Sequence, residues 1–457
     1  MKKIHFIGIC GISMSSLAQI LHEQGWQVTG SDLRESEISK RLEAENIPVI
    51  FGQRAENITP DMELIVYTAA VHEDNPELMA ARALAKEKPE QCRVIERSVL
   101  LGEMIDTYEI PIGIAGTHGK TSTSSMLSYM FMEADRDPTV TIGGILQNFG
   151  TNFHIGHSPY IIYEACEYSD SFLEFRGKVN IITNVEAEHL DYFGTLERIQ
   201  QSFHRFTEIM REDGVLVTGL DIAPLFSDFT GTHYTVSLDD PEADYTCANV
   251  HHHEEGLGSS FDLIYHGTNL GTLNLYVPGR HYIFDAMCAA AAALSQGLPF
   301  DAIARGLSTY KSTKKRFEYK GTWNGVAIVD DYAHHPTEIR ATLEAASEFP
   351  HKELYVAFQP HTYSRTKSFL PDFVKALSAA DHVVLADIYA AREPDLHEVH
   401  SKDIMDGLTK IGVDCHYFPT FDEIEKFLLE KISPGDLLIT MGAGTIVTIG
   451  ESILSRS

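Results

Sequence analysis

The sequence predicts an α/β protein of three domains, in which helices cover parallel sheets. Short apolar runs alternate with helical patterns along most of the 457 residues, and this alternation is typical of parallel sheets with helices on their faces. Three blocks of the chain open with an apolar run followed by glycines or polar residues; they begin at the N-terminus, near Ile110 and near Thr313. We therefore predict domains over residues 1–107, 108–312 and 313–457.

The first block begins with IHFIGICGIS at residues 4–13, which reads as a buried strand, a glycine turn and the start of a helix. Two lysines precede this apolar run, as in a signal peptide, but Gly8, Gly11 and several serines interrupt it and favour the strand and helix. The segments WQVTGSDL and ELIVYTAA read as further strands, and a helix is predicted over Glu77–Lys86.

The second block repeats the strand, loop and helix with IPIGIAGTHGKTSTSSMLSYMF. The segments YIIYEACE and VNIITNVEAEH read as later strands that end in polar residues. In open α/β sheets, ligands gather at these carboxyl ends. Residues 233–278 are rich in short β-type stretches and predict an added antiparallel edge, and FDAMCAAAAALSQG then reads as a helix.

The third block contains four apolar strands that end in polar clusters, with a helix predicted over Glu338–Glu348. The strands are VAIVDDYAHHPTEI, ELYVAFQPHTYSR, HVVLADIYAA and DLLITMGAG.

The composition excludes several classes of partner. The net charge is −29, and a strongly acidic protein repels the phosphates of nucleic acids and of anionic membranes, so we expect neither. No apolar run approaches the roughly 20 residues of a membrane-spanning helix. The six cysteines are far apart and form no C-x-x-C pair, which is typical of a reduced, cytoplasmic protein without a disulfide framework or zinc site.

The segment AGTHGKTST at residues 115–123 has the core of a phosphate-binding loop. It departs from the full pattern G-x-x-x-x-G-K-[ST], because Ile114 stands at the position of the first glycine. Gly119 lets backbone N–H groups turn toward phosphate oxygens, Lys120 can reach the β- and γ-phosphates, and the Thr121 hydroxyl can bind Mg²⁺. The alternative is a glycine turn followed by a surface lysine.

Carboxylates and histidines follow two strands of the second block. Mg²⁺ prefers oxygen ligands, and two strand ends of one parallel sheet can converge on the phosphate loop. The alternative for each cluster is a solvated loop. The residues are Glu164 and Glu167 after one strand, and Glu186, Glu188, His189 and Asp191 after the other.

The third block carries Asp330, Asp331, His334 and His335 after one strand and His361 with Arg365 after the next. A guanidinium can hold a carboxylate by two parallel hydrogen bonds. Alternatively, Asp331 caps a helix and Arg365 is a surface charge.

With these residues in place, the chain resembles the Mur ligases of bacterial cell-wall synthesis. The matching segments occur in the same order over essentially the whole chain, and two of them, FQPHTYSRT and DIYAAREP, favour the member of the family that adds L-alanine. The others are GICGISMS, GSD, DNPE, GTHGKTST, GGI, EACEYSDSF, TNVEAEHLD, PGRH, KKRFE, VDDYAHHPTE and GAGTI.

The resemblance implies a Rossmann-like N-terminal domain that binds a UDP-sugar, a central P-loop-type α/β domain that binds ATP, and a Rossmann-like C-terminal domain that binds the amino acid. It implies that L-alanine is joined to the lactyl carboxylate of UDP-N-acetylmuramate through an acyl phosphate, with ADP and phosphate as products. ATP with Mg²⁺, or Mn²⁺ in its place, would be the cofactor, and the chain would be a monomer or a homodimer.

The resemblance also implies roles for single residues. Lys120, Glu164 and His189 would be catalytic, with Thr121, Glu164 and His189 as metal ligands. The ATP site would comprise Gly116, Thr117, His118, Gly119, Lys120, Thr121, Ser122, His281, Arg316 and Asp331. The UDP-sugar site would comprise Gly8, Gly11, Ser31, Asp32 and His118, and the amino-acid site His335, His361 and Arg365.

Some positions depart from the family pattern and leave alternatives open. Cys10 and Ser13 stand where glycines are common, and Cys166 and Thr445 stand where aspartates are usual. Tyr282 and Asp285 replace asparagines near the adenine, which would suit a non-catalytic nucleotide-binding homologue. A Mur ligase that adds another amino acid or recycles tripeptide is a second alternative. A nicotinamide oxidoreductase, suggested by GICGIS, is a third.

Overall fold

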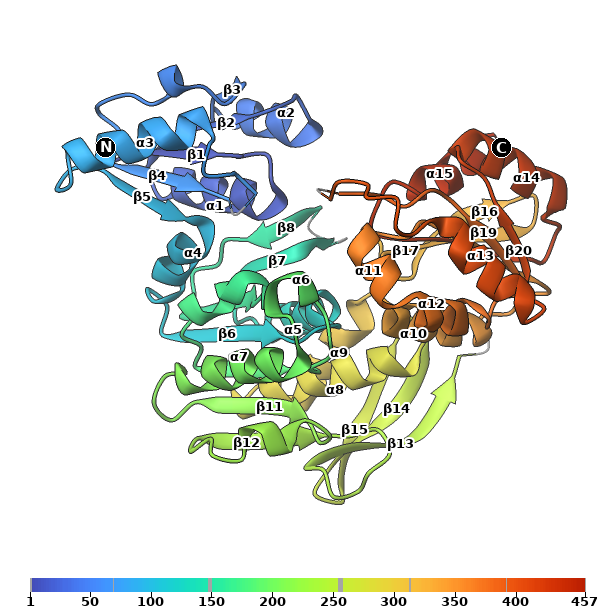
Figure 1. Cartoon of the computed structure of the whole chain (residues 1–457). Helices are drawn as coiled ribbons and strands as arrows, with labels where there is room; N and C mark the ends of the chain where they lie inside the picture. The colour runs from blue at the N-terminus through green and yellow to red at the C-terminus, as the bar shows by residue number, and fades with distance from the viewer. Residues whose placement is uncertain are drawn as a thin grey trace. The chain divides into compact units, whose positions relative to one another are not determined.

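The computed structural model in Figure 1 describes residues 2–68, 70–146, 150–253, 258–311, 314–391 and 393–456. The chain forms two compact units. Unit 1 contains Met1–Ser124 and Phe131–Tyr234, and unit 2 contains Ser125–Met130 and Thr235–Ser457. The domain boundary predicted after residue 107 falls within unit 1, and the one predicted between residues 312 and 313 lies outside the described residues. The two domain boundaries therefore stay a prediction.

The first sheet of unit 1 is parallel throughout, in the order β3-β2-β1-β4-β5. Its central strand β1 (Lys3–Ile7) leads through Gly8 into α1 (Ile12–Glu23), which is the predicted strand, turn and helix. The helix predicted over Glu77–Lys86 is α3 (Pro76–Glu87). The other elements are β2 (Gln27–Asp32), α2 (Glu37–Ala44), β3 (Val49–Phe51), η1 (Ala55–Asn57), β4 (Leu64–Tyr67), β5 (Arg93–Glu96) and α4 (Arg97–Ile105).

The second sheet of unit 1 has the order β12-β11-β10-β6-β9-β7-β8. Strand β6 (Ile110–Ala115) pairs in parallel with β9 (Tyr160–Glu164) on one side and β10 (Val179–Ile182) on the other. Because the three carboxyl ends lie at one edge, the residues that follow them meet there. The remaining elements are α5 (Lys120–Glu133), β7 (Thr139–Leu146), β8 (Thr151–His154), η2 (Tyr168–Glu174), α6 (Leu190–Phe193), α7 (Leu196–Glu208), β11 (Val215–Gly219), η3 (Ala223–Phe226) and β12 (Thr232–Val236).

Specific contacts join the two sheets of unit 1. The Asn152 amide in β8 donates to the Ser16 hydroxyl of α1 at 2.7 Å. The Arg211 guanidinium donates to the carbonyl oxygens of Tyr108 and Glu109, at 2.8 and 3.2 Å, where the chain passes from one sheet to the next. The Asn152 contact is buried and the Tyr108 contact is half-buried, so water competes little with them and they hold the two sheets together.

Unit 2 begins with the antiparallel edge predicted for residues 233–278. Val236 of β12 pairs in parallel with Tyr245 of β13 (Tyr245–His252), and β14 (Ser259–Tyr265) and β15 (Thr268–Leu275) then continue antiparallel, which confirms that prediction. The predicted alanine-rich helix is α8 (Arg280–Ser295), followed by α9 (Phe300–Thr309).

The third sheet has the order β16-β17-β21-β18-β19-β20 and is parallel except for β16. The helix predicted over Glu338–Glu348 is α10 (Pro336–Ser347). Three sheets of mainly parallel strands with intervening helices confirm the α/β class (Figure 1). The remaining elements are β16 (Glu318–Trp323), β17 (Val326–Asp331), β18 (Leu354–Phe358), α11 (Tyr363–Ser368), α12 (Leu370–Leu377), β19 (His382–Leu385), α13 (Ser401–Lys410), β20 (Asp414–Tyr417), α14 (Phe421–Lys431), β21 (Leu437–Met441) and α15 (Val447–Ser455).

Within the described ranges, no helix combines the length and the apolar character needed to cross a membrane.

Candidate active site

The predicted phosphate loop joins β6 to α5 at residues 116–119. Gly116 has φ +136°, and a Cβ there would lie 2.0 Å from the Thr183 hydroxyl, so only glycine fits. Gly119 has φ +83° and turns the chain into α5, which begins at Lys120. The loop therefore leads into the N-terminus of a helix, where backbone N–H groups and the helix dipole favour an anion.

Residues after β10 hold the backbone of this loop. The Asn184 amide accepts from His118 N at 2.9 Å and donates to His118 O at 3.1 Å. The Thr183 hydroxyl donates to His118 O at 2.5 Å, and Glu186 N donates to the Thr117 hydroxyl at 2.9 Å. Because both backbone polar groups of His118 and the Thr117 side chain are engaged, the loop is preorganised.

Lys120 lies in the first turn of α5 and pairs with Glu167. Its Nζ lies 3.0 Å from Glu167 Oε2 and 3.1 Å from Thr117 O, and it also donates to Gly116 O. Burial disfavours the charge, but the carboxylates of Glu167 and Glu164 outweigh it and hold the pKa of Lys120 above its ordinary value. Lys120 is therefore a buried, charged ammonium beside the loop.

Glu164 ends β9 and is oriented by two donors. Its Oε1 accepts from Gly143 N at 2.7 Å and from the Ser124 hydroxyl of α5 at 3.4 Å. Thr121 and Ser122 follow Lys120 in the same helix turn and are buried. A carboxylate oxygen and a threonine hydroxyl are ligands that suit Mg²⁺.

His189 lies at the start of α6 with φ 52°, in the left-handed region. Its Nε2 is 3.7 Å from Glu167 Oε1, and its ring centroid is 4.7 Å from that of Tyr168. Glu167 thus lies between the Lys120 ammonium and the His189 imidazole. The three predicted catalytic residues, Lys120, Glu164 and His189, all lie at the carboxyl edge of the β6, β9 and β10 strands.

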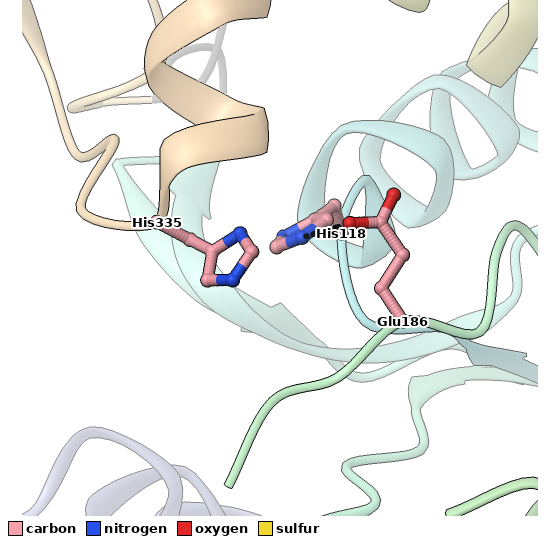
Figure 2. A group of neighbouring side chains, drawn as sticks. All are labelled: His118, Glu186 and His335. Carbon is pink, nitrogen blue, oxygen red and sulfur yellow. Dashed lines mark ion pairs between the residues drawn. The ribbon is translucent and has the colours of Figure 1, made fainter. Parts of the chain in front are cut away.

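The His118 side chain, predicted for both nucleotide sites, turns toward Glu186. Figure 2 shows the two side chains, and His118 Nε2 lies 3.6 Å from Glu186 Oε2. The imidazole is largely buried, whereas the carboxylate is 37 % exposed.

The glycine turn after β1 is held by the end of β2. Gly8 N and Ile9 N donate to Ser31 O at 2.8 and 3.0 Å, and Cys10 N donates to Asp32 Oδ2 at 2.9 Å. Gly11 immediately precedes α1. Gly8, Gly11, Ser31 and Asp32 are thus brought together as predicted residues of one site. The Ser31 hydroxyl itself is buried and donates to Glu77 Oε2 at 2.6 Å.

In unit 2, Asp331 and Arg316 lie near each other. Asp331 accepts from Phe317 N and Ala333 N, both at 2.7 Å. Burial raises the pKa of Asp331 to about 6, against the influence of the Arg316 charge and the two N–H donors. Arg316 is 3.7 Å from Glu338 Oε1, so its guanidinium is held at the start of α10.

His281 is a second predicted ATP residue in unit 2. Burial, together with the positive charge of Arg316, lowers the pKa of His281 to about 4, so its imidazole is neutral at neutral pH. The Tyr282 ring lies 4.1 Å from it, centroid to centroid. Tyr282 and Asp285 are 2 % and 4 % exposed, so both belong to the interior of the folded chain.

The three residues predicted for the amino acid lie at two strand ends of the third sheet. Arg365 NH1 lies 3.1 Å from His361 Nδ1 and donates to His361 O at 3.1 Å. His335 caps α10, as its place before that helix in Figure 2 shows, by accepting from Thr337 N at 3.3 Å, and its ring packs against Phe369, 4.8 Å between centroids. His361 also stacks on Tyr389 at 5.5 Å.

Several contacts of these sites were not predicted from the sequence. Glu167 stands in a carboxylate cluster, but its pairing with both Lys120 and His189 depends on the turn after β9. Asn184 belongs to the segment TNVEAEHLD, which also contains His189. Its place in that segment could have marked it as a residue of the site. Nothing in the local sequence marks Gly143 as the donor to Glu164.

Three family models match the chain. "Mur ligase family, catalytic domain" matches residues 3–109, "Mur ligase middle domain" matches residues 114–293, and "Mur ligase, glutamate ligase domain" matches residues 315–444.

Curated relatives and a solved structure match over the full length. The UDP-N-acetylmuramate–L-alanine ligases of Agathobacter rectalis and Lachnoclostridium phytofermentans are 48 % and 47 % identical to this chain; each match covers 99 % of the chain and 98 % of the relative. The crystal structure of UDP-N-acetylmuramate-alanine ligase MurC from Thermotoga maritima has 27 % identity and a TM-score of 0.84; the match covers 100 % of this chain and 99 % of that one.

Proposed function

The chain belongs to the Mur ligase family, and we propose that it uses ATP to join L-alanine to the lactyl carboxylate of UDP-N-acetylmuramate. The observation that carries the proposal is the cluster of Lys120, Glu164, Glu167 and His189 around the loop that leads into α5. Family membership accounts for this loop, whereas a nicotinamide oxidoreductase leaves it without a role.

The residues present fit ATP and Mg²⁺. Gly116 leaves a cradle that a Cβ would fill, and Lys120 supplies a buried positive charge beside it. Thr121, Glu164 and His189 would hold Mg²⁺, or Mn²⁺ in its place, and Gly119, Ser122 and Thr117 would contact the phosphates. ATP, when bound, supplies the phosphoryl group that activates the lactyl carboxylate as an acyl phosphate.

The first domain, residues 1–107, would bind the UDP-sugar. Asp32 and the glycine turn after β1 support this assignment, because a carboxylate at the end of the second strand can accept from sugar hydroxyls. Ser31 would act through its carbonyl oxygen, since its hydroxyl is bound to Glu77. The second and third domains would be residues 108–312 and 313–457.

Residues of unit 2 would bind the amino acid and part of ATP. Arg365 and His361 lie in contact and can together receive the carboxylate of L-alanine, with His335 beside Phe369 at the end of α11. Arg316, Asp331 and the neutral His281 would contact ATP. The buried Tyr282 and Asp285 replace family asparagines without disturbing α8, so they give little support to a non-catalytic homologue.

The chemistry that these residues perform is positioning and neutralisation of charge. Lys120 and the N-terminus of α5 would stabilise negative charge that develops on the transferred phosphoryl group. The preorganised loop would hold the triphosphate, and the Arg365–His361 pair would hold the carboxylate of L-alanine; fixing each reactant in this way lowers the entropic cost of reaction.

Phosphate release tests the proposal. Purified protein with UDP-N-acetylmuramate, ATP and Mg²⁺ should release phosphate when L-alanine is added. A panel of amino acids, including glycine and serine, would define the acceptor. Release without any amino acid, or release that depends on tripeptide, would refute the assignment to L-alanine.

The substrates support a cytoplasmic location, where ATP and nucleotide-linked sugars are made. The six cysteines are all free, as in proteins of reducing compartments.

A further inference from the structure

Lys120 has a protein partner for each of its three N–H donors. The partners are Gly116 O, Thr117 O at 3.1 Å and the Glu167 carboxylate, whose Oε2 and Oε1 lie 3.0 and 3.4 Å from Nζ. The Lys120 side chain is 16 % exposed and that of Glu167 is 3 % exposed, so water competes little for the ion pair. A phosphate oxygen that binds Lys120 must therefore replace one of these three partners.

Two of the partners are fixed by the loop. Gly116 lies against Thr183, and Thr117 N donates to Asn184 O at 3.2 Å. The Thr117 hydroxyl also accepts from Glu186 N. Moving either carbonyl oxygen would break the contacts that hold the loop, whereas the Glu167 carboxylate can move by rotation of its side chain.

Glu167 has a second partner within reach, the His189 imidazole. Its Oε1 lies 3.7 Å from His189 Nε2, slightly too far for a full hydrogen bond. Tyr168, the next residue, packs its ring on the same imidazole and keeps it near. A small rotation of the carboxylate away from Lys120 would thus bring it onto His189.

We propose that Glu167 is an exchangeable partner of Lys120, whose carboxylate leaves the ammonium for His189 when a phosphate group binds. This inference rests on the proposed function, because it concerns the same phosphate loop. A carboxylate and a phosphate are anions that compete for one ammonium. Glu167 therefore weakens nucleotide binding while it keeps the ammonium in place.

The change Glu167→Gln tests the exchange by calorimetric titration of the full chain with ATP and Mg²⁺, without sugar or alanine. The amide removes the competing charge, so the Kd should fall at least about threefold. In the complete reaction, kcat should fall, because His189 loses its carboxylate partner. A residue that only supported the fold would instead give a higher Kd; a raised or unchanged Kd would overturn the exchange.

Two further variants complete the test. Glu174→Gln, at an exposed position of the same η2 segment, should leave the Kd unchanged. If the Glu167→Gln variant does not fold, Glu167→Asp shortens the carboxylate side chain and should still lower the Kd, by a smaller factor; no decrease would overturn the exchange. Wild-type protein that binds no ATP would refute the proposed function itself, whereas wild-type binding without tightening in the variant refutes only the exchange.

Discussion

Unit 1 contains two glycine turns, one after β1 and one after β6, which each join a strand to a helix but have different neighbouring side chains. Both follow a buried central strand and lead into a helix, and in both the end of a neighbouring strand bonds the turn. After β1 the neighbour offers the Asp32 carboxylate to Cys10 N. After β6 it offers the neutral Asn184 amide to both backbone groups of His118, and Lys120 and Glu167 lie beside the turn.

This difference supports the proposal that two similar sequence patterns bind different ligands. The carboxylate can accept from the hydroxyl groups of a nucleotide sugar, whereas the ammonium beside the neutral amide can pair with the charge of a triphosphate. We therefore propose that the strand, glycine and helix pattern provides a binding turn and that the charge at the neighbouring strand end helps to select the ligand.

Removing the ammonium should have the largest effect. We expect Lys120→Ala to lower kcat by about a thousandfold or more, because the buried charge beside the phosphate loop is lost. UDP-N-acetylmuramate should still bind with unchanged Kd, since its proposed turn lies after β1. Lys426→Ala, in the exposed part of α14, serves as the control and should retain full activity. Turnover by the Lys120→Ala variant at the wild-type rate would contradict the role given to the loop.

Substituting one glycine in each turn should separate the two ligands. Gly116→Ala places a Cβ 2.0 Å from the Thr183 hydroxyl at φ +136°, and strain of about 1–3 kcal/mol should disrupt ATP binding. Gly8→Ala places a Cβ 2.9 Å from the Thr68 methyl at φ +86° and should weaken the UDP-sugar instead. Calorimetry with each ligand measures both; loss of the same ligand in both variants would contradict the comparison.

The same comparison shows which parts of the fold and of the site could be predicted from the sequence. The helices over Glu77–Lys86 and Glu338–Glu348 could be predicted from the sequence, because capping residues and the spacing of apolar residues are local features. Lys120, Glu164 and His189 could be placed at strand ends by pattern. The pairing of Glu167 with both Lys120 and His189 could not, because the three residues follow different strands and meet only in the folded chain. Parallel pairing of β6 with β10 is likewise needed to bring Asn184 to His118.

Exchanging the two strand-end acceptors should have an intermediate effect. Asn184→Asp adds a negative charge beside the phosphate loop and removes the donor to His118 O, so we expect the ATP Kd to rise about tenfold, which corresponds to about 1.4 kcal/mol. Asp32→Asn removes a charge from the first turn and should change only UDP-sugar affinity. If Asp32→Asn raised the ATP Kd as much as Asn184→Asp does, charge at the strand end would not select the ligand.

The smallest effect concerns the cysteine in the first turn. Burial, reinforced by the Asp32 charge and opposed by Ser36, raises the pKa of Cys10 to about 11. Since the thiolate is the reactive form, alkylation of Cys10 by iodoacetamide should be slow at pH 7 and should accelerate about tenfold for each pH step toward 11. Mass spectrometry of the Cys10 peptide measures the rate, and bound UDP-sugar should slow it further because the ligand would cover the turn. Rapid alkylation at pH 7 would mean that the turn is more open, and less negatively charged, than the bond from Cys10 N to Asp32 indicates.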